Sequence, residues 1–460
     1  MATSRTNLIR SFLTATACAL ILCPASLAFS DWLDGLDEIK IGDRTYPVCP
    51  EEYLTKLGFA VREVPDDQNA AIEYVKAINL YVKEPADLYA VYGYVQGSVW
   101  IPEANTLIPW LEKNAPAIAA LREAAKKKDC KFPFLMKPEQ PIFNMLLPHL
   151  SPMRQMARLL AIQGRYLEHQ KKYHEALENY LVIARMGYHI SGEPLLISGL
   201  VGIALDSISA KSIESCILRN RLDTDTLTYL LRRLDGVGRS AENYLPAMCT
   251  EKVAGLSMLD FLFNRPAEFY SLFGSDEGRG SKLRGLLGIV QLKPLGLRAI
   301  MKSDFRRYWE QMDEWNGLPD HIALRPENRL DEKIIEELPP WSLAKLLLPA
   351  LSRARVSFVR MKATKAVLTA EVALEIYRNE KREYPRNLDQ LKGILDKIPA
   401  DPFTNEPLKY RRTERGYVVY SVNADFEDDG GQGRLTTQDK DIVGRYPLPE
   451  PKPFEPGGAK

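Results

Sequence analysis

The sequence predicts a mainly α-helical protein, made of helical hairpins or a bundle, that ends in a small α+β unit. Apolar residues recur at helical spacing after Ser151-Pro152, and a second helical stripe runs from Val359 to Tyr377. Two short apolar segments around Glu414-Arg415-Gly416 are typical of a β-hairpin. The length of 460 residues allows two or three domains with sizeable cores. The expected divisions are a signal peptide over 1–28, a mainly helical region over 29–135, a helical domain over 136–350, the α+β unit over 351–450 and a Pro-rich tail over 451–460.

The first residues have the layout of a secretory signal peptide. Arg5 and Arg10 are the only charges before Asp31, an apolar stretch follows them, and Ser26-Leu27-Ala28 offers small residues for cleavage after Ala28. An uncleaved anchor over residues 11–29 in the inner membrane is the alternative, since that stretch is near the length of a bilayer span. A lipoprotein signal ending at Cys18 has too few apolar residues before it. The expected location is periplasmic or secreted.

Charge and cysteine content exclude several classes of function. The formal net charge is +1, and removal of the signal takes away two arginines and no acid. A nearly neutral chain has no electrostatic footprint for nucleic acid. The four later cysteines form no C-x-x-C pair, so a zinc site is not expected. They allow three disulfide connectivities, or buried thiols, which we favour for Cys216 and Cys249; the four are Cys49, Cys130, Cys216 and Cys249.

The middle of the chain predicts a tight helical hairpin. Ser151-Pro152 is an N-cap followed by a first-turn proline, and a polar break at 169–172 separates two apolar stripes. Gly164 and Ala176 would let the two helices approach, with Tyr180 filling the groove between them. Residues 151–190 weakly resemble a tetratricopeptide unit, and such helical-repeat units imply binding of protein partners. A solenoid needs about three units, and only one is visible here.

Further helices are expected downstream. Leu195–Leu205 is apolar but too short for a membrane span, which indicates a core helix. Helices are also expected from Asp223 to Asp235 and from Glu242 to Phe263. Tyr308, Trp309 and Trp315 fall on another helix, where packing is the favoured role. Gly274–Lys282 lacks the phosphate-binding loop spacing and is interpreted as a solvated linker.

No catalytic constellation is visible. None of the histidines has a spacing that places two imidazoles on one helix face, and there is no G-x-S-x-G elbow. The five histidines are His149, His169, His174, His189 and His321. The sequence therefore names no catalytic residue, and an enzyme is the less favoured interpretation.

The C-terminal segment carries the most specific pattern. The stripe from Val359 to Tyr377 predicts a long amphipathic helix that Tyr384-Pro385 ends. A short helix after Asn387, a turn at Asp401-Pro402-Phe403 and a hairpin of 408–410 with 417–420 follow. This order, from about residue 354 to 447, resembles the globular domain of the major pseudopilin of type II secretion.

In that family an acidic loop holds calcium, and the matching loop here begins at Ser421. The resemblance implies a Ca2+ ion with protein ligands at Ser421, Asp425, Asp439 and Asp441. Five aspartates within seventeen residues would repel one another without a cation, and hard divalent ions prefer oxygen ligands. Asn423 and Phe426 stand where the family usually has glycine, and phenylalanine adopts a left-handed backbone with difficulty. The alternative is a solvated acidic hairpin tip.

The expected function is non-catalytic binding or a structural role in the envelope, linked to a secretion or pilus-like assembly. The long helix follows a large helical domain and lacks a hydrophobic filament-core segment, so the chain is not expected to be a filament subunit. Partners would be proteins bound through the helical domain, with membrane contact only through an uncleaved N-terminus. The alternative is an enzyme acting on an envelope polymer, with a site between the helical and C-terminal domains and a pocket of convergent titratable groups.

Overall fold

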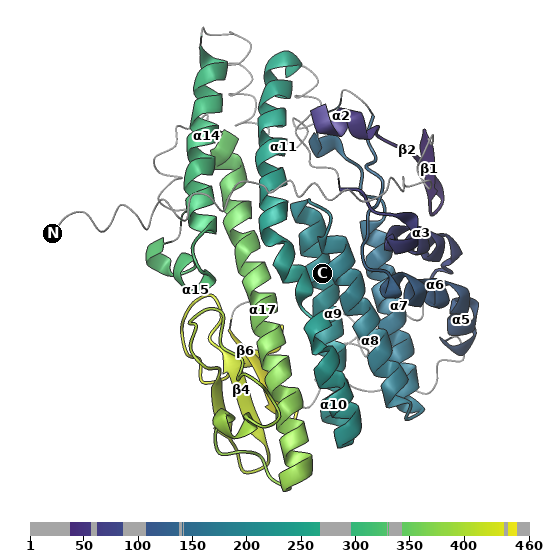
Figure 1. Cartoon of the computed structure of the whole chain (residues 1–460), viewed down its shortest axis with the longest axis vertical. Helices are drawn as coiled ribbons and strands as arrows, with labels where there is room; N and C mark the ends of the chain where they lie inside the picture. The colour runs from purple at the N-terminus through teal and green to yellow at the C-terminus, as the bar shows by residue number, and fades with distance from the viewer. Residues whose placement is uncertain are drawn as a thin grey trace, which may run out of the picture.

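The protein is mainly helical, with a small β-sheet near its C-terminus (Figure 1). The computed structural model describes residues 37–56, 62–85, 107–137, 140, 142–266, 296–328, 330, 343–436 and 440–448. The signal peptide, the linker over 274–282 and the Pro-rich tail expected from the sequence lie outside the described residues. Long helices stand side by side along the longest axis, and the sheet lies against the lower half of the longest helix.

The N-terminal region is helical, as expected, but it also contains a small β-hairpin that the sequence did not indicate. Asn69 caps α3 by accepting a hydrogen bond from the Ala71 amide, and α3 packs on α6. The elements are β1 (Glu38–Ile41), β2 (Arg44–Pro47), α2 (Glu51–Lys56), α3 (Ala70–Leu80), α5 (Leu107–Lys113) and α6 (Ala115–Lys126).

The predicted helical hairpin is α7 (Leu150–His169) and α8 (Tyr173–Ser191). Helix α7 begins one residue before the predicted N-cap, Ser151, which lies in the first turn. The Tyr180 ring lies so close to Gly164 that a Cβ there would overlap it. The tight approach predicted from Gly164 is therefore confirmed.

Helix α9 (Leu196–Asn220) is the centre of the helical layer and contacts α7, α8 and α17. Its closest neighbour is α8, because a Cβ on Gly187 would lie 2.7 Å from the Gly202 carbonyl oxygen. By length and composition alone α9 could cross a membrane, but more than half of its most apolar window is buried inside the protein. A core helix of a folded protein passes the same test, so this is weak evidence for a span.

The predicted helices after α9 are present, and the aromatic side chains of α14 are buried as expected. Tyr308, Trp309 and Trp315 are each less than a twentieth exposed. The helices are α10 (Thr224–Arg233), α11 (Tyr244–Asn264), α14 (Leu297–Asn316) and α15 (Asp320–Ala323), with short 3-10 turns η3 (Leu234–Gly236) and η4 (Arg239–Asn243) between α10 and α11.

Helix α17 (Leu343–Lys381) begins earlier than expected and ends before Tyr384-Pro385, with Arg382 in a left-handed conformation. The sequence suggested one apolar stripe, but the helix buries two faces. One packs on α9 and α10 and the other on the sheet. Phe358 and Leu368 are buried in addition to Val359 and Ala363 of the predicted stripe. The domain boundary expected at 350 thus falls inside a continuous helix that both parts share.

The sheet has four strands in the order β3-β4-β6-β5. The predicted hairpin is β3 with β4, and β6 pairs antiparallel with β4 and parallel with β5. The strands are β3 (Lys409–Arg412), β4 (Tyr417–Ser421), β5 (Gly433–Arg434) and β6 (Asp441–Tyr446), preceded by the 3-10 turn η6 (Leu388–Leu391).

Of the cysteines, Cys49, Cys130 and Cys216 are buried thiols outside any disulfide, whereas Cys249, expected to be buried, is exposed on α11 because its side chain lies on the outer face of that helix.

Candidate functional site

The acidic loop that follows β4 curls through several left-handed residues. Asn423 has φ 63°, Phe426 has φ 62°, and Gly430 and Gly431 also have positive φ. Phenylalanine at this position does not prevent the turn, contrary to the sequence-based expectation. Its ring packs edge-to-face on Phe403, with centroids 6.2 Å apart, and this contact supports a conformation that costs about 1–2 kcal/mol for a residue with a Cβ.

Ser421 is buried, and its hydroxyl is engaged within the protein. Its Oγ donates to Oδ1 of Asp401 over 2.8 Å, and Oδ2 of the same carboxylate accepts from the Val422 amide over 3.0 Å. Asp401 also accepts from the Phe403 amide. The Asp401-Pro402-Phe403 turn is thereby joined to the start of the acidic loop, a link that its sequence spacing does not reveal.

Asp441 is the residue of the predicted site with an unsatisfied buried atom. It is fully buried at the start of β6, its Oδ2 accepts from the Gly431 amide over 2.8 Å, and its Oδ1 has no hydrogen-bond partner. Burial raises the pKa of this carboxyl, the backbone amides of Gly431 and Asp429 oppose that shift, and the nearby charges of Asp429 and Asp428 add to it. An orphan buried carboxylate oxygen costs roughly 1–3 kcal/mol, and a bound cation would remove that cost.

Of the other predicted ligands, the described ones form no metal-binding group of acids with Asp441. Asp425 is exposed, and its Oδ1 accepts from the Glu427 amide over 3.2 Å. Asp439 lies outside the described residues. Within the part of the chain that the structure describes, no three His, Cys, Asp or Glu side chains are grouped so that they could hold a metal ion. The carboxylate oxygens of this loop are the type of ligand that a hard cation prefers, and Asp441 is the one whose position in the fold is best defined.

The acidic loop is fastened to α17 at two points. Nε of Arg360 donates to Oδ1 of Asn423 over 3.0 Å, and Nδ2 of Asn423 donates to the Lys440 carbonyl over 2.7 Å. One turn further along α17, the buried Thr364 hydroxyl donates to the Leu435 carbonyl over 3.0 Å. A conformational change in the loop would therefore alter its hydrogen bonds to Arg360 and Thr364 of α17.

A second candidate site is a cavity of about 320 Å³ between the segment around Cys130–Phe134 and the end of α8. His149 and Glu193 line it, both are buried, and Nε2 of His149 lies 2.8 Å from Oε1 of Glu193. The Ser198 hydroxyl donates to the other carboxylate oxygen over 2.5 Å. Neither ring nitrogen of His149 has a hydrogen-bond partner of suitable geometry.

His189 lines the same cavity. Its Nδ1 lies 2.8 Å from the Tyr74 hydroxyl, and its buried Nε2 has no partner. Burial, helped by the charge of Arg185, lowers the pKa of His189 to about 3, so the ring is neutral at physiological pH. Burial also raises the pKa of the Cys130 thiol well above its ordinary value. Because the thiolate is the nucleophilic form, Cys130 is not an activated cysteine.

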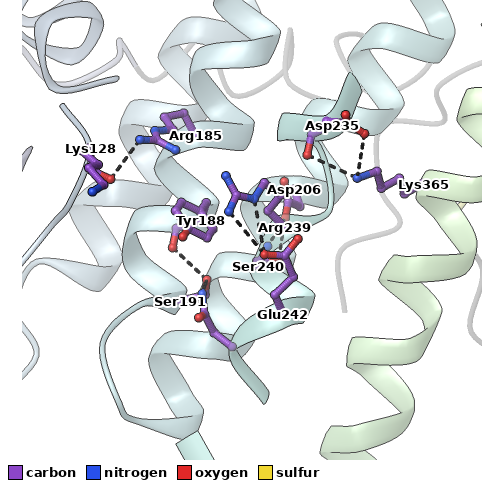
Figure 2. Close-up of polar contacts among 11 residues, drawn as sticks. Lys128, Arg185, Tyr188, Ser191, Asp206, Asp235, Arg239, Ser240, Glu242 and Lys365 are labelled. Atoms are coloured by element: carbon purple, nitrogen blue, oxygen red, sulfur yellow. Dashed lines mark hydrogen bonds and ion pairs between the residues drawn. The ribbon is translucent and has the colours of Figure 1, made fainter. Parts of the chain in front are cut away.

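Arginines hold the wall of this cavity in place. Arg185 donates to the Lys127 carbonyl over 2.7 Å and to the Lys128 carbonyl over 3.0 Å, and the second contact is drawn in Figure 2. The Tyr188 ring packs against both Arg185 and Arg239, whose guanidinium carbons lie 5.2 and 4.1 Å from its centroid. Sequence reasoning missed this cavity, since His149 and His189 are forty residues apart and only the fold brings them together.

Comparison of the chain with family models, with curated proteins and with solved structures gave no significant match.

Proposed function

We propose that this protein is a non-catalytic binding or structural protein of the cell envelope whose acidic C-terminal loop takes up a calcium ion. The observation that supports it is Asp441, a fully buried aspartate with one unpartnered oxygen beside the charges of Asp428 and Asp429. A divalent cation would neutralise this cluster through oxygen ligands. Asp425, Asp439 and Asp441 remain the proposed side-chain ligands, and Asp429 is added to them by its proximity.

Ser421 has two roles in this proposal. Its hydroxyl donates to Asp401, which anchors the start of the loop, and the oxygen keeps lone pairs that could contact the ion. Calcium takes about six to eight oxygen ligands, so main-chain carbonyls and water would complete the set. This chemistry would organise the loop without any reaction.

The proposed cellular setting comes from the sequence. A cleaved signal would export the chain to the periplasm or beyond, with an inner-membrane anchor over 11–29 as the alternative. The long helix, hairpin and acidic loop in the pseudopilin order suggest a link to a secretion or pilus-like assembly. Because α17 is packed on α9 and α10, the pseudopilin-like unit would act as a fixed part of a larger protein that meets protein partners through its helices.

Calorimetric titration of the full-length protein with calcium tests the proposal directly. We expect one site that Asp441→Asn weakens strongly. Asp396→Asn is the matched control, because Asp396 is an exposed acid in the same part of the chain, away from the loop. Absence of calcium binding at millimolar concentration would contradict the proposal.

The second candidate function is an enzyme, and the His149–Glu193 pair is the observation that favours it. A carboxylate beside an imidazole in a cavity is an arrangement used for general base catalysis. The cavity that contains the pair is lined by the N-terminal region and the helical domain, not by the helical and C-terminal domains as the sequence suggested. Release of soluble fragments from purified envelope polymer by the full-length protein, lost in His149→Gln, would favour this function over the first.

A further inference from the structure

A groove of about 480 Å³ lies along three helices, next to the acidic loop, and Arg360 both lines this groove and donates to Asn423 of the loop. Helix α9 contacts α7 and α17, and residues from all three line the groove together with Thr436 from the loop after β5. Figure 1 shows α17 and α7 on opposite sides of α9. The groove thus follows a stripe of α9 that its neighbours leave uncovered.

Helical spacing sets which side chains face the groove. On α7 the arginines Arg154, Arg158 and Arg165 are four and seven residues apart, which places them on one face. On α9 the lining residues are apolar along the first turns and become polar further on, where Lys211 lies. The apolar lining residues are Ala161 of α7, Leu200, Ile203, Ala204 and Ile208 of α9, and Met361 of α17.

The groove has a strong excess of positive charge. Arg360 of α17 joins the three arginines of α7 and Lys211, and among the described residues that line the groove none is acidic. Arg165 also lies 2.7 Å from the buried Glu168, and Arg360 donates to Asn423. The five basic side chains lie beside an apolar floor, where ionic interactions are stronger than in bulk water.

Lys211 lies near one acid, Glu214, and near Arg434. Although its side chain reaches solvent, burial lowers the pKa of its ammonium group, the charge of Glu214 raises it, and the charge of Arg434 lowers it. The acid close to it, Glu214, has its own pKa raised by burial, which favours the protonated, neutral form. An anionic ligand would favour the charged form of Lys211, because an opposite charge nearby stabilises the ammonium group.

The size and lining of the groove define the ligand. Its volume is that of a small-molecule site, too small for a bilayer surface or a second helix. Guanidinium groups recognise phosphate oxygens with paired donors, and the floor offers an apolar surface to a hydrocarbon chain. We propose that this groove binds an anionic amphiphile with a phosphate head and a single apolar chain.

The test uses the full-length protein and decyl phosphate below its micelle concentration, titrated by calorimetry in calcium-free buffer. The absence of calcium keeps this result independent of the proposed loop site. Inorganic phosphate supplies the head alone, decyl maltoside supplies the chain with a neutral head, and phosphatidylglycerol vesicles supply an anionic membrane. We expect one decyl phosphate per protein, bound at least about tenfold more tightly than either half-ligand, because head and chain contacts add.

Two variants locate the binding. Arg154→Gln and Lys211→Gln each remove a charge from an exposed side chain of the groove, and each should weaken decyl phosphate binding roughly ten- to hundredfold. Arg232→Gln, an exposed arginine of α10 outside the groove, is the matched control and should bind like the unaltered protein. Melting curves identify any variant that fails to fold, and the other variant then decides the result.

Each remaining outcome overturns the proposal. Equal affinity for inorganic phosphate would indicate a simple anion site, and equal affinity for decyl maltoside would indicate an apolar groove without charge selection. Binding to anionic vesicles without binding of monomeric decyl phosphate would indicate a membrane surface. Unchanged affinity in both variants would place the ligand elsewhere.

Discussion

Nε of Arg360 donates a hydrogen bond over 3.0 Å to Oδ1 of Asn423, which joins the middle of α17 to the first turn of the acidic loop. The same arginine lines the basic groove, so one side chain touches both the proposed calcium loop and the proposed ligand groove. Asn423 is also left-handed, with φ 63°. Its side chain and its backbone therefore both shape the loop.

Asn423 allows these two contributions to be separated. Asn423→Gly removes the side-chain hydrogen bonds but tolerates positive φ, whereas Asn423→Ala removes the bonds and strains the backbone. We expect the alanine variant to be less stable than the glycine variant by about 1 kcal/mol, measured by urea unfolding. A more stable alanine variant would show that the loop does not hold this conformation.

The α7–α8 hairpin predicts a steric effect at Gly164. Gly164→Ala should lower the free energy of unfolding by about 1–3 kcal/mol, because the added methyl group overlaps the Tyr180 ring. Ala176→Leu, at another fully buried position of the hairpin, should be similarly costly. Gly236→Ala is the control, since a Cβ there meets no atom within 4 Å. Equal melting midpoints for Gly164→Ala and Gly236→Ala would contradict the tight packing.

Asp206 predicts a pH dependence of stability. It is fully buried on α9 and accepts hydrogen bonds from the Ser240 amide, at 3.2 Å, and from the Ser240 hydroxyl (Figure 2). Burial raises its pKa from 3.8 to about 7, against the opposing effect of these hydrogen bonds. Its stabilising contribution is therefore complete below the unfolded pKa and is lost as the pH rises through the folded pKa.

Asp206→Asn, which is neutral at every pH, isolates that contribution. Relative to the unaltered protein, the variant should gain stability between about pH 4 and pH 8, by up to about 4 kcal/mol for a shift of this size. Urea unfolding at several pH values measures the difference. A difference that is constant over this range would mean that Asp206 titrates normally.

The N-terminal pattern predicts export with cleavage after Ala28. The exported protein should begin at Phe29, as Edman sequencing or intact mass would show. An exported chain that retains Met1 would favour the membrane anchor over residues 11–29.

Local patterns predicted the elements of this fold well. Helix α10 starts next to Asp223, where the sequence predicted its start, with Asp223 accepting from the Thr226 amide, and the strand pair around Gly416 forms as expected. The packing of these elements on one another was not predictable. Helix α17 buries two faces, and the periodicity of its apolar residues does not reveal which elements cover each face. Gly187 against Gly202 is another example, since small residues in two helices signal a contact only once their pairing is known.

The candidate sites also differ in how much of each could be predicted from the sequence. Asp441 belongs to a run of acids that the sequence displays, although its burial and its orphan oxygen come from the sheet. His149, His189 and Glu193 are not at a sequence spacing that would indicate a shared site, and the arginines of the basic groove come from separate helices. Side chains that meet only through tertiary packing leave no periodic signal in a single sequence.

Thermal unfolding of the full-length protein with calcium and with chelator tests the central claim most directly. If Asp441 and its neighbours bind the ion, the melting midpoint should rise with calcium, by an amount equivalent to about 2.7 kcal/mol at a hundredfold excess over the dissociation constant. Magnesium should stabilise far less, because it keeps its water and prefers a rigid octahedral site. The effect should vanish in Asp441→Asn and persist in Asp396→Asn. Superimposable curves with calcium and with chelator would show that the loop is a solvated acidic tip.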